Sequence, residues 1–237
     1  ATKDMTSNYK DLSNADFSAS KISNADFSNS NFTNTNFFST NFDFLNLTNT
    51  DITNSDFSYS WLGNLEVEKT IIHNVDFTKS WIFFSDFTKS DLKNVIFDMS
   101  RCTNCKFDNM DISEIKIGKN NIHPTNFPGS SFKNVDFRNW EHGTVDFSSK
   151  ISAKDGKLLG VPPADLTGSN FSGVDLKNIV FNRLPFEEWE RDVRVNLSNV
   201  DFSFADLSHH DLTYANLEGA NLEGANLEGA NLEGANL

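Results

Sequence analysis

The chain has 237 residues, 38% of them hydrophobic, and a formal net charge of −13 at pH 7. No run of about 18 apolar residues occurs, which argues against a membrane-spanning helix. The acidic balance argues against direct binding to nucleic acid, because phosphates attract clusters of Lys and Arg. Two cysteines are too few for a disulfide scaffold of this length.

An apolar residue recurs at every fifth position from Leu12 to Phe147, and only Cys102 and His142 interrupt the series. Most of these centres follow a small residue and an Asp or Asn, and Ser or Thr often comes next, as in Ala15-Asp16-Phe17-Ser18. A period of five fits neither an amphipathic helix nor an ordinary strand. It predicts a repeat architecture in which each unit turns one corner and stacks on its neighbours.

This pattern resembles the pentapeptide-repeat family, whose units read small residue, Asp or Asn, Leu or Phe, Ser or Thr, and any residue. The resemblance covers roughly residues 10–147, 164–183 and 195–237. It implies an all-β fold, a right-handed quadrilateral β-helix with four pentapeptides in each coil. In such a coil the centre and the residue two before it point inward, and the other three face solvent. About ten coils spaced by ~4.8 Å would form a rod on the order of 50 Å long.

Residues twenty apart should form columns if such coils stack, and three columns indeed sort by residue type. The column of centres reads Phe17, Phe37, Phe57, Phe77, Phe97, Ile117 and Phe137. The outward column reads Asn14, Asn34, Asn54, Asn74, Asn94, Glu114 and Asn134. The inward column reads Ser20, Thr40, Ser60, Ser80, Ser100, Asn120 and Trp140. A period of five alone would not separate Phe, Asn and Ser. Stacked asparagines and aromatic rings stabilise cross-strand ladders, so the residues support a four-sided coil.

The two cysteines occupy positions that should both point inward. Cys102 is a centre and Cys105 lies two before the next centre. Their CxxC spacing is compatible with a metal or redox site, but no second CxxC or nearby pair of histidines completes a zinc site. We therefore interpret both as small buried apolar residues, and we predict no metal and no cofactor.

The five-residue pattern breaks twice, and we predict a loop inserted at a corner in each case, over 148–165 and 182–194. If no side is lost, Leu166 follows Phe147 around the coil. Both loops then leave the rod at the same corner, one coil apart, and should touch each other. An irregular coil over the first stretch is the alternative. The residues that would continue the phenylalanine column are Phe171 and Phe202.

The second loop carries the residues that we single out as loop contacts: Phe186, Glu187, Glu188 and Trp189. A helical turn after Pro185 would place Phe186 and Trp189 on one face. Loops on a rigid scaffold often carry function, and tolerated surface insertions are an equal alternative.

The ends complete a single domain that spans residues 1–237. Residues 1–11 are expected to form an N-terminal cap segment, and 195–237 the C-terminal coils. From Ala215 the sequence Ala-Asn-Leu-Glu-Gly repeats without change, with no capping segment. An open coil end exposes strand edges, so we expect end-to-end or homodimeric association. We interpret the tail as the end of a fragment of a longer protein, or as an engineered or recently duplicated segment.

Aromatic residues gather on one predicted outer side. The outward column that precedes its centres reads Lys21, Asn41, Trp61, Trp81, Arg101, Asn121 and Glu141. Phe44 and Phe84 stand two after their centres on the same side, with Tyr59, Lys79 and Phe83 nearby. Exposed aromatic clusters tend to mark contact surfaces, and burial under the N-terminal segment is the alternative. The predicted protein-interaction residues are Trp61, Trp81, Phe44, Phe84 and Arg101.

No catalytic set is apparent, because none of the five histidines has a partnered nucleophile and base beside it. We therefore predict that the chain is not an enzyme. We interpret it as a scaffold or protein-interaction module with a protein partner, a segment of a larger bacterial protein. A cytoplasmic location is favoured over secretion.

The family resemblance implies a second class of function, a DNA-mimicking rod that occupies the DNA site of a type II topoisomerase. The rod shape, the acidic charge and the paired loops favour this alternative. The absence of a dimerising end and the spread of aspartates argue against it. A domain of a secreted bacterial effector is a third alternative. The aspartates fall into three predicted columns: Asp11, Asp51, Asp91 and Asp111; Asp16, Asp56, Asp76 and Asp136; Asp26, Asp86 and Asp146.

Overall fold

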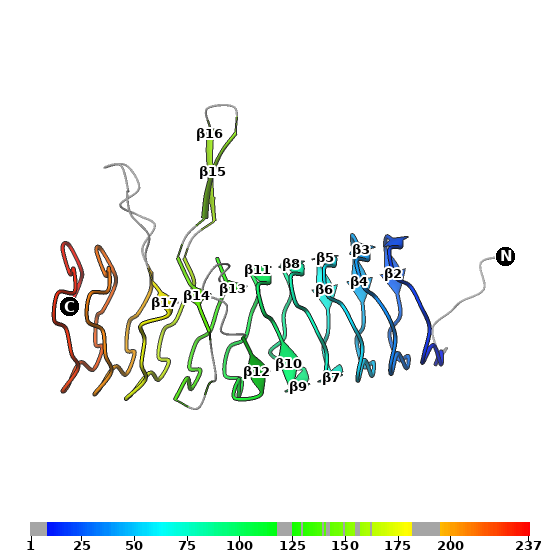
Figure 1. The fold of residues 1–237 in the computed structure, drawn as a ribbon, viewed down its shortest axis with the longest axis horizontal. Helices are drawn as coiled ribbons and strands as arrows, with labels where there is room; N and C mark the ends of the chain where they lie inside the picture. Colours follow the sequence, from blue (N-terminus) through cyan, green and yellow to red (C-terminus); the bar gives the residue numbers. More distant parts are fainter. Residues whose placement is uncertain are drawn as a thin grey trace.

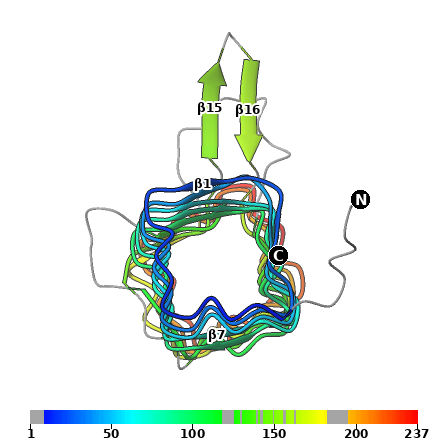
Figure 2. The same cartoon turned by 90° about the vertical axis from the view of Figure 1, so that its right-hand side faces the viewer.

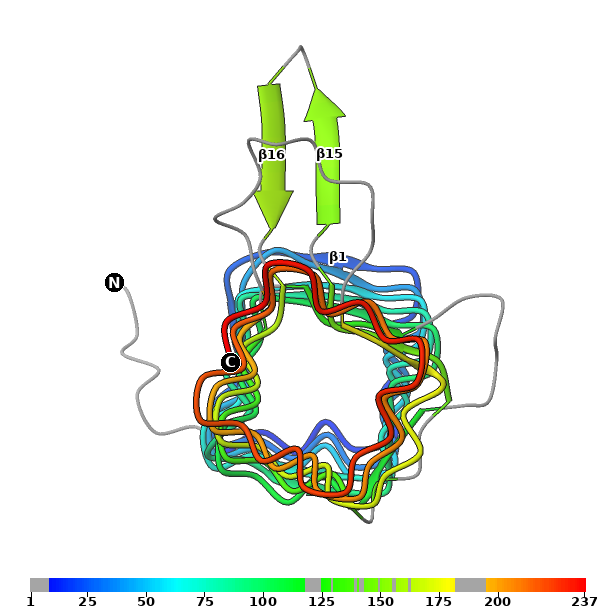
Figure 3. The same ribbon diagram turned by 90° about the vertical axis from the view of Figure 1, so that its left-hand side faces the viewer.

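The chain forms a right-handed, four-sided solenoid in the computed structural model (Figure 1). Its coils stack along one axis, and the end-on views show a square cross-section (Figure 2, Figure 3). We name the first, second, third and fourth sides in chain order, beginning with those centred on Leu12, Phe17, Ile22 and Phe27. The predicted all-β fold is confirmed. The structure describes residues 9–117, 125–128, 130–138, 140, 143–148, 150–154, 157–161, 163–181 and 195–237.

Short parallel strands line the sides because each pentapeptide supplies only two or three extended residues before the next corner. The third side carries an eight-stranded sheet with one strand per coil: β1 (Lys21–Ile22), β3 (Asn41–Phe42), β5 (Trp61–Gly63), β8 (Trp81–Phe83), β11 (Arg101–Thr103), β13 (Thr125–Asn126), β14 (Val145–Asp146) and β17 (Ile179–Val180). The fourth side carries β2 (Ala25–Asp26), β4 (Leu45–Asn46) and β6 (Leu65–Glu66). The other parallel pairs are β7 (Ile71–His73) with β9 (Asp91–Lys93) on the first side and β10 (Val95–Ile96) with β12 (Ile115–Lys116) on the second.

The corners explain the asparagine column. Most described corners hold a residue with positive φ, as at Asn34 and Asn54, both with φ of 59°, and asparagine adopts this region more readily than most residues. The amides also bond along the rod: Asn54 Nδ2 donates to Asn34 Oδ1 at 3.0 Å, and Asn74 Nδ2 donates to Asn54 Oδ1 at 3.0 Å. Asparagine therefore both adopts the backbone conformation of the corner and forms a side-chain hydrogen bond to the neighbouring coil.

The core is a stack of phenylalanine rings inside the second side. Phe57 is fully buried, with ring centroids 4.5 Å from Phe37 and 5.4 Å from Phe77, and both pairs are stacked. Inward hydroxyls close the adjacent corners, because Ser60 Oγ donates to the carbonyl oxygen of Phe37 at 2.7 Å. Side chains twenty residues apart therefore stack on one another over this part of the rod, as predicted.

The predicted columns are wrong beyond Ile117. Arg101 pairs with Asn126, 25 residues later, instead of Asn121. The coil that includes residues 118–124 therefore has five residues more than its neighbours. Since five residues equal one side, every later centre moves to the adjacent column.

This shift relocates the later aromatic residues. Phe137 stacks on Phe171 at 4.2 Å, and Phe171 on Phe202 at 5.5 Å, as a first-side column separate from the second-side stack. Asn134 bonds to Asn109 rather than lying on Glu114, with 3.0 Å between Nδ2 and Oδ1. Trp140 leaves the predicted column of hydroxyl residues as well, and its Nε1 donates to the carbonyl oxygen of Ile115 at 2.9 Å.

The interpretation of the cysteines also needs a correction. Both are buried, as predicted, but Cys102 and Cys105 are joined by a disulfide, with Cα atoms 5.8 Å apart. The reason is geometric: a centre and the residue three after it face inward from the two sides of one corner. Leu62 and Leu65 fill the equivalent positions as two separate apolar side chains.

The first predicted insertion contains an antiparallel hairpin of β15 (Lys150–Lys154) and β16 (Lys157–Val161), which projects beyond the third side (Figure 2). The chain rejoins the corner that it left, because the amide of Ala164 donates to the carbonyl oxygen of Phe147 at 2.8 Å. An irregular coil is not what forms over these residues.

The second predicted insertion begins at the equivalent corner one coil later, since Phe181 stacks on Phe147 at 6.3 Å and Asp165 pairs with Asn196. Its residues 182–194 lie outside the described residues. The same is true of the predicted loop contacts and of any contact between the two insertions. These predicted contacts are Phe186, Glu187, Glu188 and Trp189.

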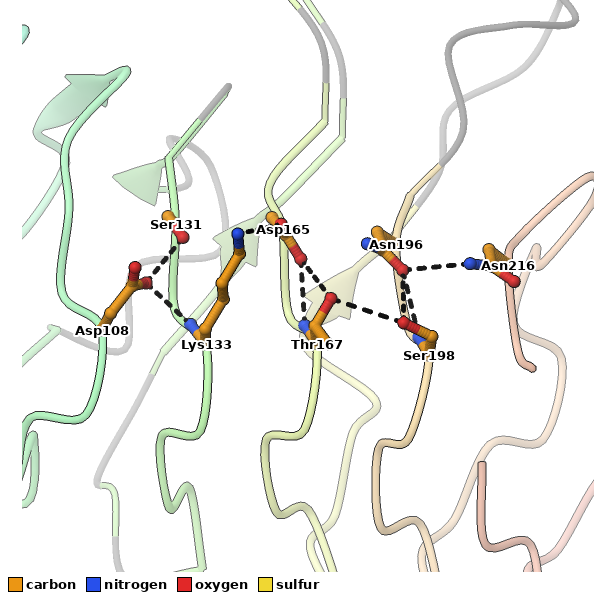
Figure 4. Close-up of polar contacts among 8 residues, drawn as sticks. All are labelled: Asp108, Ser131, Lys133, Asp165, Thr167, Asn196, Ser198 and Asn216. Atoms are coloured by element: carbon orange, nitrogen blue, oxygen red, sulfur yellow. Dashed lines mark hydrogen bonds and ion pairs between the residues drawn. The ribbon is translucent and has the colours of Figure 1, made fainter. Parts of the chain in front are cut away.

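A polar ladder on the fourth side keeps the coils in register across these changes in coil length (Figure 4). Asp108 Oδ1 accepts from the amide of Lys133 at 2.9 Å, and Lys133 Nζ pairs with Asp165 at 3.1 Å. Further along, Asn216 Nδ2 donates to Asn196 Oδ1 at 3.2 Å. The outward polar side chains of successive coils therefore remain stacked on this side, although the number of residues between stacked partners changes.

The aspartates that precede the centres should make the rod acid-sensitive. The amide and hydroxyl of Ser18 bond to Asp16 and hold the pKa of its carboxyl below the ordinary value of 3.8; Ser203 does the same for Asp201. A folded-state pKa below the unfolded one gives stability that is present above 3.8 and is lost as pH falls through the folded values. We expect the melting temperature to fall between pH 5 and about pH 2.

The matched control is Asp16→Asn, because Asn36 already accepts the equivalent amide bond, from Phe38, at 3.0 Å. This variant should fold normally and lose slightly less stability in acid than the wild type. A melting temperature that stays constant or rises on acidification would contradict the assignment.

Candidate functional site

Three aromatic rings contact one another on the outside of the third side. Trp61 and Trp81 are 45% and 46% exposed, and their ring centroids are 5.3 Å apart. Phe83 lies 4.8 Å from Trp61 and 6.4 Å from Trp81. The guanidinium carbon of Arg101 lies 5.9 Å from the ring centre of Trp81. We call these four residues the third-side aromatic surface.

The sheet register places these side chains together. Trp61 pairs directly with Trp81, and Trp81 with Arg101, along β5, β8 and β11. The residue before each centre faces outward, because the centres Leu62 and Ile82 point into the core. The twenty-residue coil therefore stacks the outward residues in a row about 4.8 Å apart.

A second exposed group continues this surface around the corner between the second and third sides. Tyr59 is 51% exposed, and its ring centroid lies 5.4 Å from that of Phe38. Lys79 Nζ donates to the Tyr59 hydroxyl at 2.7 Å and lies 4.8 Å from the ring centre. The prediction named Tyr59 and Lys79 but missed Phe38, which follows its centre directly and so also faces outward.

Phe44 and Phe84 stand at the opposite corner, between the third and fourth sides. They border a hollow of about 470 Å³, which Leu65 and Val67 also line, although both of these side chains are buried in the core. Asn64 lies in the same corner column, one coil from each phenylalanine. Phe84 is 62% exposed and has a φ of 53°, a backbone conformation that is rare for a bulky side chain.

The far wall of this hollow is acidic. Glu66, Glu68 and Asp86 line it together with one lysine, Lys89. Lys89 pairs with Glu68 at 3.1 Å, whereas the carboxylate of Glu66 has no ion pair or hydrogen bond among the described residues. The sequence prediction did not include this acidic wall, because it considered the acidic residues along whole columns and not beside Phe44 and Phe84.

The structure thus brings Trp61, Trp81 and Arg101 into contact but separates them from Phe44 and Phe84. All five predicted residues lie on the outer surface, and Arg101 is partly buried. Within the described part of the chain, neither Phe44 nor Phe84 makes a ring–ring contact. The predicted patch is therefore two neighbouring features, the third-side aromatic surface and the hollow.

The described residues include no group of three or more His, Cys, Asp or Glu side chains placed to hold a metal ion. Over the same residues, no helix has the length and apolarity that a bilayer span requires. His210 bonds through its ring nitrogens to the carbonyl oxygens of Ser208 and Leu176, at 3.1 and 3.0 Å, while His142 lies outside the described residues.

Comparison with known proteins gives one family match. The model of pentapeptide repeats matches eight copies, within residues 11–43, 30–64 and 201–237. A search of curated protein sequences finds no match to this chain.

Solved structures of pentapeptide-repeat proteins resemble the chain at low identity. HetL, involved in the regulation of heterocyst differentiation in the cyanobacterium Nostoc sp. strain PCC 7120, has 20% identity and a TM-score of 0.32, over 97% of this chain and 89% of that chain. QnrB1, a plasmid-mediated fluoroquinolone resistance protein, has 12% identity and a TM-score of 0.35, over 90% and 91%. A protein of the Arabidopsis thaliana thylakoid lumen has 14% identity and a TM-score of 0.23, over 78% and 77%.

These scores carry no argument about function, and the fold rests on the hydrogen bonds and the register described above. The family model covers repeats near both ends of the chain, and the same coil continues between them through the Asn and Phe ladders. Residues 11–64 and 201–237 are thus pentapeptide repeats, and the described coils between them continue the same four-sided solenoid.

Proposed function

We propose that this chain is a non-enzymatic protein-interaction module whose partner docks on the third-side aromatic surface. The observation that carries the proposal is the contact between two half-exposed tryptophans, Trp61 and Trp81, in a row that otherwise holds Lys, Asn, Arg, Asp and one Val. A solenoid core gains nothing from these outward rings. Desolvating them against a partner would bury large apolar area, and Trp and Arg dominate such contacts.

The packing of the rings favours a protein over a planar ligand. Trp61 and Trp81 stack on each other with 30° between their planes, so the facing sides of the two rings are occupied. Bases of single-stranded nucleic acid bind by stacking on free ring faces, and the −13 charge opposes phosphate. The exposed ring edges fit instead into apolar pockets of a partner protein.

The test is the double variant Trp61→Ser/Trp81→Ser, because Ser131 already occupies the outward position before its centre on the fourth side. We expect an unchanged melting temperature within a few degrees and at least about a tenfold loss of affinity for any partner identified with the wild-type chain. The matched control is Phe204→Asn, which removes a 69% exposed ring from the distant first side. Full binding by the tryptophan variant would refute the proposal.

The alternative function is mimicry of DNA toward a type II topoisomerase, and the acidic surface is the observation that favours it. Asp51 and Asp56 lie outside neighbouring sides of one coil, so carboxylates flank the corner between them. Against this reading, Asp136 lies one side away from its predicted column, and Asp146 is fully buried. A gyrase supercoiling assay tests this alternative; inhibition or protection by the wild-type chain would support it.

A further inference from the structure

We propose that the hollow between Phe44 and Phe84 receives a Lys or Arg side chain from an extended segment of the partner protein. This inference rests on the proposed function, because it assigns a chemistry to the partner. It concerns a different feature from the tryptophans, so the two can fail separately.

The first support is the alternation of residues along this corner. The column reads Asn24, Phe44, Asn64, Phe84 and Asn104. Phe84 keeps the left-handed backbone conformation that asparagine adopts at Asn64 and Asn104, with φ values of 53°, 50° and 55°. A bulky side chain in this conformation, largely exposed, stabilises nothing in the rod. Tyr59 and Phe204 adopt the same conformation at other corners, so what distinguishes this corner is the pair of exposed phenylalanines on either side of one asparagine.

The second support is the shape of the hollow. The two phenylalanines are separated by two coil spacings, about 10 Å, with the smaller Asn64 between them. Leu65 and Val67 at its base are buried in the core, so the two rings supply the exposed large apolar side chains of the hollow, and the whole space is about 470 Å³. A long unbranched side chain fits such a space, with its methylene stem against the rings and its charged end free to reach the wall.

The third support is charge. Three carboxylates and one ammonium line the hollow, so its formal charge is negative. Glu68 is already paired with Lys89, and Asp86 with Lys106 at 3.6 Å. The carboxylate of Glu66 has no such partner among the described residues, and a cation seated between the phenylalanine rings would supply one.

The surrounding surface already makes contacts of this type. Arg101 lies over Trp81 and Lys79 over Tyr59, with the charged atoms 5.9 and 4.8 Å from the ring centres. Cations favour aromatic ring faces within about 6 Å. In the hollow, by contrast, no cation of the described chain lies over Phe44 or Phe84. A basic side chain of the partner would complete the same arrangement there.

The test uses a library of random twelve-residue peptides displayed on phage, selected against the whole chain and counter-selected against the Phe84→Asn variant. We expect enriched peptides to contain Lys or Arg. Synthetic copies should bind Phe84→Asn at least about tenfold more weakly and Glu66→Gln about threefold more weakly, with weaker binding in 0.5 M salt. Asparagine is native at the neighbouring coils, so Phe84→Asn should fold, and its melting temperature verifies this.

The matched control is Phe204→Asn, since Phe204 is an exposed phenylalanine with a φ of 56° far from the hollow. Its binding of the same peptides should equal that of the wild type. Three results overturn the inference: no peptide enriched by the counter-selection, enriched peptides without basic residues, or self-association of the chain that Phe84→Asn abolishes. If Trp61→Ser/Trp81→Ser loses the partner and Phe84→Asn keeps it, the proposed function stands and the basic-residue assignment fails.

Discussion

Replacing Phe57 with alanine is expected to lower the free energy of unfolding by about 3–5 kcal/mol, the usual cost of truncating a buried phenylalanine. Phe57 is fully buried and lies within 6.4 Å of three other rings, those of Phe37, Phe42 and Phe77. The solenoid interior cannot collapse into the space left behind, because the hydrogen bonds along the rod fix the spacing of the coils. Equilibrium unfolding in urea measures the loss.

The effect should also be local. In a repeat protein each coil contacts only its neighbours, so a defect weakens the nearest interfaces first. Hydrogen exchange should show lost protection around Phe37 and Phe77 and little change around Phe171. Phe38→Ala is the control, because Phe38 is 42% exposed and should cost less than about 1 kcal/mol. A loss at Phe57 as small as that at Phe38 would contradict the stacked core.

The sequence predicts the coil because its constraints repeat. An inward centre, a hydroxyl or small inward residue and a residue tolerant of positive φ recur every five residues, and only a four-sided coil satisfies all three. The five-residue period cannot reveal an insertion of five residues, because after such an insertion the apolar centres still recur at every fifth position. The coil between Arg101 and Asn126 has such a length, and only the change of residue type at Glu114, Ile117 and Trp140 signalled it.

The sequence predicts which side chains face outward, but it does not predict which of them contact one another. Outward positions follow from the repeat, so the exposure of Trp61 and Trp81 follows from counting residues. Which rings meet depends on the stacking of coils, and the hollow depends on Asn64 being smaller than Phe44 and Phe84. The disulfide was missed for a related reason, because the inward positions were considered singly rather than as pairs across one corner.

The repetitive tail has a specific structural role for glycine that leads to the last prediction. Gly219, Gly224, Gly229 and Gly234 occupy corners with positive φ, each directly beyond a larger residue of the preceding coil. A Cβ at Gly224 would lie 2.7 Å from the ring of Phe204. Gly173 has nearly the same φ, 68° against 67°, but no residue that the structure describes lies within 4 Å of such a Cβ.

Gly224→Asn should therefore destabilise the chain by about 1–3 kcal/mol, the cost of overpacking, while Gly173→Asn should change stability by less than about 0.5 kcal/mol. Backbone conformation is the same at the two sites, so the difference isolates the clash with Phe204. Urea unfolding of both single variants measures it. Equal effects at the two positions would mean that conformation, and not the neighbouring ring, selects glycine.

The double variant Phe204→Asn/Gly224→Asn sharpens the test. It would place two asparagines in stacked corners, as at Asn34 and Asn54, where the amides bond at 3.0 Å. We expect it to recover most of the stability lost in Gly224→Asn, a coupling between contacting residues that two independent sites would not show. Recovery would demonstrate that the outward columns of this rod are chosen in stacked pairs, with glycine opposite a large side chain and asparagine opposite asparagine.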